Sequence, residues 1–390
     1  MEIKPLLAFL LVVTCASLTT AQKCVTSRGI AGECTARSAC KPFQEVISRS
    51  NFKSLRQRKQ NEIVISWRCG QSYTAVCCPN DKPYTEPPPS VESHWNLRLL
   101  PDECGESSSD RAFGGNLTEL LDYPWMALIS TETTNGDIVT IEFTCGGTII
   151  NSRYILTAAH CITKLNNRRL LGVRVGEWDK SKDPDCIDEY CYTYQDIAIE
   201  EVLPHPEYVG IISGKSFNLQ NDIGLLRLAD RINLTQANVK PICLPITKQM
   251  REVKIKKDEK VTLTGWGSSN ILENGSITTS KTLNPKLLQI NVPLVPNEIC
   301  AEKYNGSDVG GIGFRQLCAS GLKGVSSCDG DSGGPMMYSV VVAKKRQVKV
   351  VQYGVVSAGH STCGTEDKPG ILTNVLYYMD WILDNLKPDF

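Results

Sequence analysis

The chain has 390 residues, of which 42 are Lys or Arg and 42 are Asp or Glu, so its formal net charge is zero. This length allows a sizeable core and more than one domain. The balanced charge argues against a nucleic-acid or membrane-surface partner, because such partners favour a basic surface, and the short run Lys344-Lys345-Arg346 indicates a solvated loop.

Residues 1–21 predict a secretory signal peptide. Lys4 supplies the basic end, residues 6–13 form a short apolar run, and Thr19-Thr20-Ala21 offers small residues for cleavage. The apolar run is too short for a membrane anchor, and no later stretch approaches the roughly 18 consecutive apolar residues that a spanning helix needs. We therefore expect a soluble, secreted mature protein.

The cysteine content fits an oxidising compartment. Of 17 cysteines, Cys15 lies in the signal peptide, and the even number of sixteen that remains suggests up to eight disulfides. A zinc site is a weak alternative, because none of the four histidines has the spacing to cysteines that zinc motifs require. Sequons for N-glycosylation, which also arise by chance, occur at Asn116, Asn233, Asn274 and Asn305, and we expect some of them to be used.

The composition of the sequence changes twice along the chain. Residues 22–78 hold six cysteines, a density typical of a small unit stapled by disulfides. Residues 79–111 include a proline-rich stretch, which predicts an exposed linker and activation segment. From residue 112 to 390, short runs of Val, Ile, Leu, Thr and Tyr alternate with turn residues, which predicts an all-β domain. Its end predicts a C-terminal helix, because apolar residues recur at steps of three or four at Leu376, Met379, Leu383 and Leu386.

Three short stretches carry residues suited to nucleophilic catalysis. His160 lies in "LTAAHC", Asp222 in "NDIGLLRL" and Ser332 in "GDSGGP". A serine hydroxyl needs a base to take its proton, and that base needs an acid to orient it and balance its charge. The backbone N–H groups of Gly330 and Ser332 are candidates for an oxyanion hole.

Residues 112–390 resemble the chymotrypsin (S1) family of serine proteases, in which His, Asp and Ser follow each other in this order. The resemblance implies a chymotrypsin-like fold of two six-stranded β-barrels with the triad between them. It also implies serine endopeptidase activity, a hydrolase chemistry that requires no cofactor. A lone Ser in a Gly-rich turn would more often be structural, but three correctly ordered motifs favour the catalytic interpretation.

The same resemblance implies pairings for the cysteines of the larger domain. Cys145–Cys161 would bracket the His160 loop, and Cys104–Cys243 would hold the preceding segment to the catalytic domain. Cys300–Cys318 and Cys328–Cys363 would frame the substrate pocket. Cys186 and Cys191 remain, and their short separation makes a local bridge plausible.

Residues 22–78 resemble the clip domain of arthropod extracellular proteases, in the spacing C-x9-C-x5-C-x28-C-x7-CC and above all in the adjacent pair Cys77-Cys78. Spacing alone leaves the connectivity open. The resemblance implies the pairs Cys24–Cys77, Cys34–Cys69 and Cys40–Cys78.

The stretch "SSDRAFGG" resembles the activation site of this family. Cleavage after Arg111 would free the amino group of Ala112, which would pair with Asp331 and order the oxyanion site. The family usually has Ile or Val at the position of Ala112. Alanine buries less apolar area, at about 0.8 kcal/mol for each methylene equivalent lost.

The residue six places before the catalytic serine forms the floor of the primary specificity pocket in this family. Trypsin-like members have Asp there, whereas this chain has Ser326. The pocket glycines correspond to Gly359 and Gly370, and Asp329 lies on the rim, where a charge is screened by solvent. We therefore expect a hydrophobic or aromatic, chymotrypsin-like preference.

The loop "GEWDKSKDPDCIDEYC" is rich in carboxylates, and family members often bind calcium there. Glu177 and Asp179 are the candidate Ca²⁺ ligands, because clustered carboxylates suit a hard cation. The alternative is an acidic loop that is simply solvated.

Together these features predict a secreted clip-domain serine endopeptidase, made as a zymogen and acting in an extracellular cascade of haemolymph, such as melanisation, Toll-type signalling or clotting. Its partners would be a protein substrate, an upstream trypsin-like protease and serpin inhibitors. One alternative is a clip-domain protease homologue that acts as a non-catalytic binding cofactor. Another is a disulfide-rich binding module in which the protease fold is only a scaffold.

Overall fold

The computed structural model describes residues 23–25, 31–41, 43–44, 47, 64, 67–69, 74–79, 88–107, 118–135, 138–163, 165, 167–213, 216–256, 259–273, 276–283, 285–304, 312–319, 331–342, 347–358 and 368–388. The expected signal peptide and the basic run 344–346 lie outside these residues. The chain forms two compact units, residues 1–85 and residues 86–390. In the described part of the chain, no helix combines the length and the apolar composition needed to cross a bilayer.

The first unit contains a small antiparallel sheet of order β1-β2-β3, formed by Lys23–Val25, Ala31–Ala36 and Ala75–Pro79. Three disulfides fasten it, and its small core consists of Cys40, Phe43, Trp67 and Val76. Such a thin core explains the need for covalent cross-links, because little apolar surface is available for burial.

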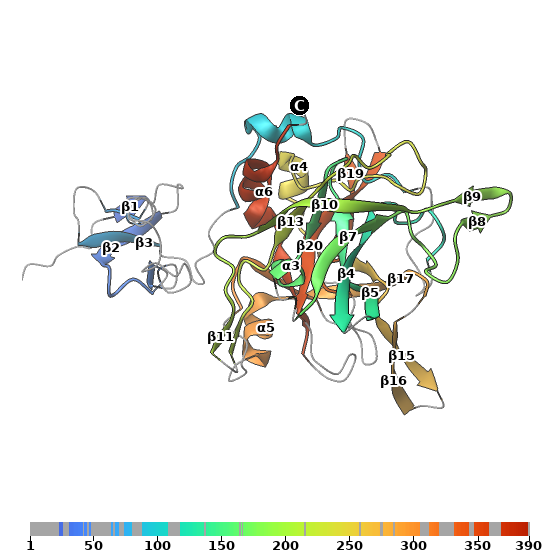
Figure 1. Ribbon diagram of the computed structural model, residues 1–390. Coiled ribbons are helices and arrows are strands. Elements are labelled where there is room, and N and C mark those ends of the chain that lie inside the picture. The colour runs from blue at the N-terminus through green and yellow to red at the C-terminus, as the bar shows by residue number, and fades with distance from the viewer. Residues whose placement is uncertain are drawn as a thin grey trace, which may run out of the picture. The chain divides into compact units, whose positions relative to one another are not determined.

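The second unit contains two closed six-stranded barrels (Figure 1). The first has the order β10-β13-β6-β5-β4-β7. Its strands are β4 (Met126–Asn135), β5 (Ile138–Ile149), β6 (Tyr154–Thr157), β7 (Arg169–Val175), β10 (Gln195–Pro204) and β13 (Gly224–Leu228).

The second barrel has the order β14-β17-β18-β21-β20-β19. Its strands are β14 (Lys260–Gly265), β17 (Leu288–Val295), β18 (Gln316–Ala319), β19 (Pro335–Val342), β20 (Gln347–Ala358) and β21 (Gly370–Asn374). The two barrels confirm the expected chymotrypsin-like fold, and closure leaves neither barrel with a free strand edge.

Antiparallel hairpins extend the barrels. They are β8 (Asp185–Ile187) with β9 (Tyr190–Tyr192), β11 (Gly210–Ser213) with β12 (Ser216–Asn218), and β15 (Ser268–Glu273) with β16 (Ser276–Leu283). In Figure 1 the β8–β9 and β15–β16 hairpins project from the body of the second unit.

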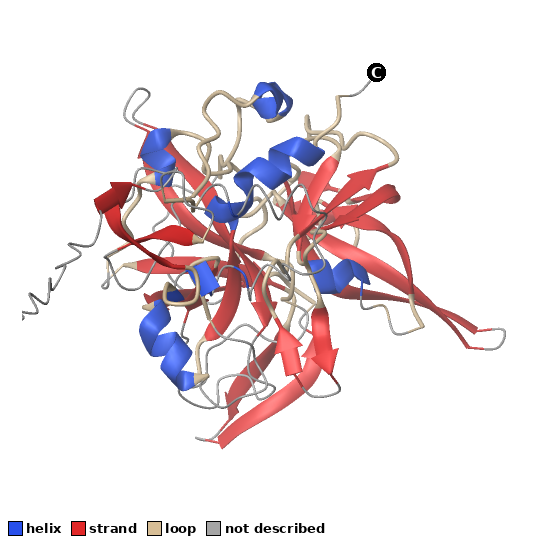
Figure 2. Ribbon diagram, turned by 90° about the vertical axis from the view of Figure 1, so that its left-hand side faces the viewer, coloured by secondary structure: helices blue, strands red, loops and turns tan. Residues whose placement is uncertain are grey.

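Helices are short and lie around the strands (Figure 2). Those of the second unit, in its described residues, are η2 (Trp95–Leu99), α3 (Ala159–Thr163), α4 (Lys248–Arg251), α5 (Asn297–Lys303), η3 (Val375–Tyr378) and α6 (Met379–Asn385). The expected C-terminal helix is therefore present as a 3-10 turn followed by α6. Its predicted face is buried at Met379, Leu383 and Leu386, which pack into the largest core cluster.

Residues 88–107 differ from the expectation of an exposed linker for 79–111. Val91 is 1% exposed and belongs to the largest core cluster, and Leu97, Leu99 and Leu100 pack against it. Half of the prolines that predicted an extended linker, Pro79, Pro83 and Pro87, lie before this stretch. Its leucines and Val91 pack against the core of the second unit instead, because burying apolar area is favourable.

Candidate active site

His160 and Asp222 meet directly in the first barrel. His160 lies in α3, just after β6, and Asp222 lies just before β13, the strand that pairs with β6. Nδ1 of His160 is 2.8 Å from Oδ2 of Asp222, and the backbone N–H of His160 donates to Oδ1 across 2.8 Å. Because an ionised carboxylate only accepts, Nδ1 carries the proton, and Nε2 is left as the base.

Asp222 is held in place from several sides. Asp222 is 0% exposed. The hydroxyl of Ser357, on β20, donates to Oδ2 across 2.5 Å, and that of Thr373, on β21, donates to the backbone carbonyl across 2.7 Å. Both donors come from the second barrel, so the carboxylate is fixed at the junction of the two barrels. Its hydrogen bonds offset the cost of burying a charge.

Ser332 lies in the turn that leads into β19. Its carbonyl accepts the N–H of Gly146, on β5, across 2.8 Å, which ties this turn of the second barrel to the first. Gly333 follows with a φ of +81°, and a Cβ there would lie 2.2 Å from Oγ1 of Thr157. Since β6 ends at Thr157 and leads into α3, the serine turn packs against the chain that presents His160.

Asp331, the neighbour of the serine, fits a notch in β14 and the turn after it. The N–H of Gly267 donates to its Oδ1 across 3.0 Å. A Cβ at Gly265 would lie 2.0 Å from that same oxygen, and one at Gly267 would lie 2.6 Å from the carboxylate, so side chains are excluded at both positions. Burial lowers the pKa of Lys180, while the carboxylates of Glu177 and Asp331 act to raise it. Lys180 therefore lies within electrostatic reach of Asp331.

Several residues singled out in the sequence lie outside the described part of the chain: Arg111, Ala112, Asn116, Asn274, Asn305, Ser326, Cys328, Asp329, Gly330, Gly359 and Cys363. Of the remaining ones, Gly370 begins β21 and is paired with Ala319 of β18. Asn233 is exposed, and its Oδ1 accepts from the N–H and the hydroxyl of Thr235 at 3.1 and 2.6 Å.

Seven disulfides are present among the described residues, and they coincide with expected pairs: Cys24–Cys77, Cys34–Cys69, Cys40–Cys78, Cys104–Cys243, Cys145–Cys161, Cys186–Cys191 and Cys300–Cys318. Two groups in the described residues have the spacing of a metal site, namely Cys24, Cys34, Cys69 and Cys145, His160, Cys161. All of these cysteines are in disulfides, so none offers the thiolate that a metal would need.

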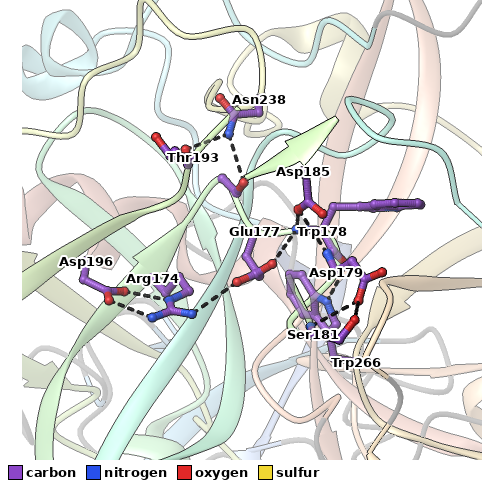
Figure 3. Close-up of polar contacts among 11 residues, drawn as sticks. Arg174, Glu177, Trp178, Asp179, Ser181, Asp185, Thr193, Asp196, Asn238 and Trp266 are labelled. Atoms are coloured by element: carbon purple, nitrogen blue, oxygen red, sulfur yellow. Dashed lines mark hydrogen bonds and ion pairs between the residues drawn. The ribbon is translucent and has the colours of Figure 1, made fainter. Parts of the chain in front are cut away.

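The acidic loop after β7 buries three carboxylates (Figure 3). Glu177 is 6% exposed and accepts from Nη1 of Arg174 across 3.2 Å. The same guanidinium makes two 2.8 Å hydrogen bonds to Asp196. Burial, followed by the charge of Asp185, raises the pKa of Glu177, and the hydrogen bond from Arg174 opposes this.

The carboxylate of Asp179 already has hydrogen-bond and ion-pair partners within the loop. It is 1% exposed, and its Oδ1 accepts from the N–H and the hydroxyl of Ser181 at 3.1 and 2.5 Å. Lys182 is 3.6 Å from Oδ2. Burial alone would raise the pKa of Asp179, but the hydrogen bonds from Ser181 and the charge of Lys182 lower it below the ordinary value.

Asp185 is the third buried carboxylate, at 4% exposed. Its Oδ2 accepts from the N–H groups of Trp178 and Asp179 at 3.0 and 3.1 Å, whereas its buried Oδ1 has no hydrogen-bond partner. Burial raises its pKa. Because the N–H of Trp178 also donates to Glu177, the carboxylates of Glu177 and Asp185 lie close together. Glu177 and Asp179 are each paired with a cationic side chain, so Asp185 is the carboxylate of this loop with an oxygen left for a hard cation.

Sequence motifs did not identify every residue that supports Asp222. Ser357 and Thr373 are far from it in sequence and lie on strands whose local pattern signals only burial. Ser357 lies two residues before the expected pocket glycine Gly359 in the sequence, and this proximity was the available signal. The partner of Asn221, Tyr378, has no local signal at all, because the contact depends on how the C-terminal helix packs.

Comparison with known proteins agrees with the fold. Residues 112–382 match the family model described as trypsin. CLIP domain-containing serine protease B4 of Anopheles gambiae is 34% identical over 379 residues, which cover 96% of this chain and 94% of that protein. Phenoloxidase-activating factor 1 of Holotrichia diomphalia is 34% identical over 377 residues, which cover 94% and 93%.

Among solved structures, the Drosophila Grass clip serine protease of the Toll pathway is 31% identical. It superposes with a TM-score of 0.59, covering 93% of this chain and 97% of that chain. The match to the family model and the nearly full-length similarity to clip-domain proteases together establish the family. This chain belongs to the trypsin family of serine proteases, also called the chymotrypsin or S1 family, and to its clip-domain members.

Proposed function

We propose that this protein is a secreted serine endopeptidase, made as a zymogen, whose catalytic residues are His160, Asp222 and Ser332. The observation that carries the proposal is the 2.8 Å contact between Nδ1 of His160 and the fully buried carboxylate of Asp222. That contact leaves Nε2 without a proton, as a base requires, and Sγ of the disulfide-bonded Cys161 lies 3.6 Å from it. The turn with Ser332 packs against the chain that presents the imidazole, which supports its role as the nucleophile.

The proposed chemistry is that of the family. Nε2 of His160 takes the proton of the Ser332 hydroxyl while Oγ of Ser332 attacks the scissile carbonyl carbon. The N–H groups of Gly330 and Ser332 stabilise the negative oxygen of the tetrahedral intermediate. His160 then gives the proton to the leaving amine. In deacylation Nε2 takes a proton from water while the water oxygen attacks the acyl carbon, and it returns that proton to Oγ of Ser332 as the carboxylic acid leaves. Asp222 holds the imidazole in the required tautomer throughout and balances its positive charge.

Activation would require cleavage between Arg111 and Ala112. The new ammonium group of Ala112 would pair with Asp331 and thereby order the oxyanion hole beside Ser332. Gly265 and Gly267 support this role, since the absence of side chains there leaves room for the Asp331 carboxylate, which the N–H of Gly267 also holds. The proposed organisation is a signal peptide at 1–21, a clip domain at 22–78, an activation segment at 79–111 and a protease domain at 112–390.

The specificity we propose is chymotrypsin-like. By the resemblance to the family, Ser326 would form the pocket floor, where it lacks the carboxylate that pairs with a substrate Arg or Lys, and Gly359 and Gly370 would leave the pocket open. An unpaired basic side chain in such a pocket costs about 3–5 kcal/mol. The enzyme would then not activate itself at Arg111.

Calcium would bind at the acidic loop. The fit rests on the buried Oδ1 of Asp185, which has no hydrogen-bond partner, and on the adjacent carboxylate of Glu177. Asp179 is paired with Lys182 and Glu177 with Arg174, so Asp185 is the ligand that we assign first, with the adjacent carboxylate of Glu177 as the second. The ion would neutralise buried negative charge and stabilise the loop, and no catalytic step involves it.

The names of the relatives support a role in an extracellular cascade. One relative is a phenoloxidase-activating factor and another a protease of the Toll pathway. For this chain we propose secretion into haemolymph, activation by an upstream trypsin-like protease, a protein substrate and control by serpins. The disulfides fit such a compartment.

An organophosphate probe tests the proposal. It should label Ser332 in protein cut at Arg111 and should label neither the uncut chain nor the Ser332→Ala variant. Cut protein that stays unlabelled would favour the alternative of a non-catalytic homologue that acts by binding.

A further inference from the structure

Residues 88–107, here called the strap, precede the proposed cleavage site and are packed on the catalytic unit. We propose that, after cleavage at Arg111, the strap keeps the amino-terminal piece bound to the catalytic unit without the Cys104–Cys243 disulfide. The inference rests on the proposed activation cleavage, but the contacts that carry it are independent of catalysis. The strap and its partners all belong to the unit 86–390.

The first anchor is apolar. Val91 is 1% exposed and is part of the largest core cluster, together with residues of the first barrel and α6. Leu97, Leu99 and Leu100 cover the edge of the same cluster. Detaching the strap would expose these side chains to water and open the core, at a cost set by the apolar area uncovered.

The second anchor closes the end of α6. Asn96 is fully buried, and its Nδ2 donates to the carbonyls of Leu383 and Leu386 at 2.8 and 3.1 Å. The last carbonyls of a helix have no partner within the helix, so the strap supplies a donor that the helix end needs. In Figure 1 the cyan helix η2 lies beside the red helix α6.

His94 adds a polar contact to the same helix. Its Nδ1 accepts the N–H of Asn96 across 3.1 Å, so the proton is on Nε2, which lies 3.1 Å from Oδ1 of Asp384. Upstream, Glu92 forms a 2.5 Å ion pair with Arg251, whose side chain is 13% exposed. The strap therefore contacts α4 and α6 through charged groups as well.

The third anchor lies around the disulfide. Gly105 has a φ of +61°, and its N–H donates to Pro241 across 2.9 Å while its carbonyl accepts the N–H of Val350 at 2.9 Å. A Cβ at Gly105 would lie 2.2 Å from the carbonyl oxygen of Val350, so the backbones approach closely. Glu106 pairs with Lys349 at 2.5 Å, and Lys349 is 7% exposed.

These anchors are spread along the strap and lie on both sides of Cys104. Because they act together, releasing one leaves the others holding the strap at a high effective concentration near its site. The Cys104–Cys243 disulfide adds a covalent link to a segment that non-covalent contacts already hold in place. The clip unit would therefore stay with the activated protease even where this disulfide is reduced.

The test uses the full chain with Cys104→Ser and Cys243→Ser, and with residues 109–111 replaced by the recognition sequence of a site-specific protease. After cleavage, the mixture is run on a size-exclusion column without denaturant. The two pieces should co-elute and should separate only in denaturant. Elution of the amino-terminal piece by itself would overturn the proposal.

Variants of the strap identify what holds it. In the same background, Val91→Ala and Asn96→Ala should each weaken retention by roughly tenfold or more, measured as the dissociation constant of the two pieces. Asp102→Ala is the control, since Asp102 is exposed on the strap, and it should change nothing. Equal retention in all three variants would show that these contacts do not carry the binding.

A second measurement tests the proposal if the double cysteine variant does not fold. The protein with native cysteines is cut, reduced without denaturant and alkylated, and modification of Cys104 is verified by mass. Co-elution of the alkylated pieces supports the proposal, and separation contradicts it. Because the inserted site is cut by an added protease, absence of natural cleavage at Arg111 would defeat the proposed activation and leave this result intact.

Discussion

Tyr378 donates its phenolic hydrogen to Oδ1 of Asn221 across 2.9 Å. Asn221 directly precedes Asp222 and has a φ of +58°, in the left-handed region that Asn tolerates better than most residues. Both partners are buried. Burial raises the pKa of Tyr378 to about 12, so its hydroxyl keeps the proton throughout the range in which a serine protease works. The start of the C-terminal helix is thus connected to the chain that presents the catalytic acid.

We expect Tyr378→Phe to lower kcat by roughly three- to tenfold with little change in KM, because Asp222 would be held less firmly while the substrate pocket is intact. Steady-state kinetics on the activated enzyme measure this split. Tyr353→Phe is the matched control, since its hydroxyl also makes one buried hydrogen bond, to the carbonyl of Met250 at 2.7 Å. Equal effects of the two variants on kcat would refute a positioning role.

Gly333→Ala should displace Ser332, the proposed nucleophile, from its catalytic position. Its φ is +81°, and the new Cβ would lie 2.2 Å from Oγ1 of Thr157. We expect kcat/KM to fall by about a hundredfold or more, because relief of this clash moves Ser332. Gly176→Ala has a similar φ of +79° and a similar clash, with Asn238, and should lower stability without the same loss of labelling at Ser332. Normal labelling of Gly333→Ala would contradict the assigned geometry.

Calcium should raise the melting temperature of the native protein by several degrees when present well above its dissociation constant. Asp185→Asn should remove this increase, since it takes away the carboxylate with the unpartnered buried oxygen. Asp183→Asn, an exposed position in the same loop, is the control. Identical melting of the native protein with calcium and with a chelator would rule out the site.

The native enzyme should prefer Phe, Tyr or Leu before the cut over Arg by roughly two decades or more in kcat/KM, and Ser326→Asp should shift the preference toward Arg. A peptide panel that varies only this residue measures both. A native preference for Arg would show that the basic side chain finds a partner elsewhere, for instance at Asp329.

The residues with local signatures were predictable. His160, Asp222 and Ser332 each lie in a short motif, and their order along the chain points to one chemistry. The two barrels followed from resemblance more than from strand patterns. The contact between His160 and Asp222 spans 62 residues of sequence, yet it could be expected because the family motif contains both.

Contacts that depend on packing were not predictable. Ser357 and Tyr378 reach Asp222 and Asn221 across 135 and 157 residues, and nothing in their own neighbourhoods reveals those partners. The strap was assigned to a linker because of the prolines in and just before it, although Val91 is buried in the core and its leucines pack against that core. In the acidic loop, the sequence could not distinguish Asp179, which is satisfied by Ser181, from Asp185, which is not.

The most direct test of the proposed catalytic unit is the kinetics of three activated variants: Ser332→Ala, His160→Ala and the double variant. If the two side chains act as one unit, each single variant should lose roughly four to six orders of magnitude in kcat, and the double variant should lose no more than either single one. All three must retain cleavage at Arg111 and the native melting temperature. A Ser332→Ala variant that keeps native activity, or losses that add up in the double variant, would contradict the assignment of Ser332 and His160 as nucleophile and base.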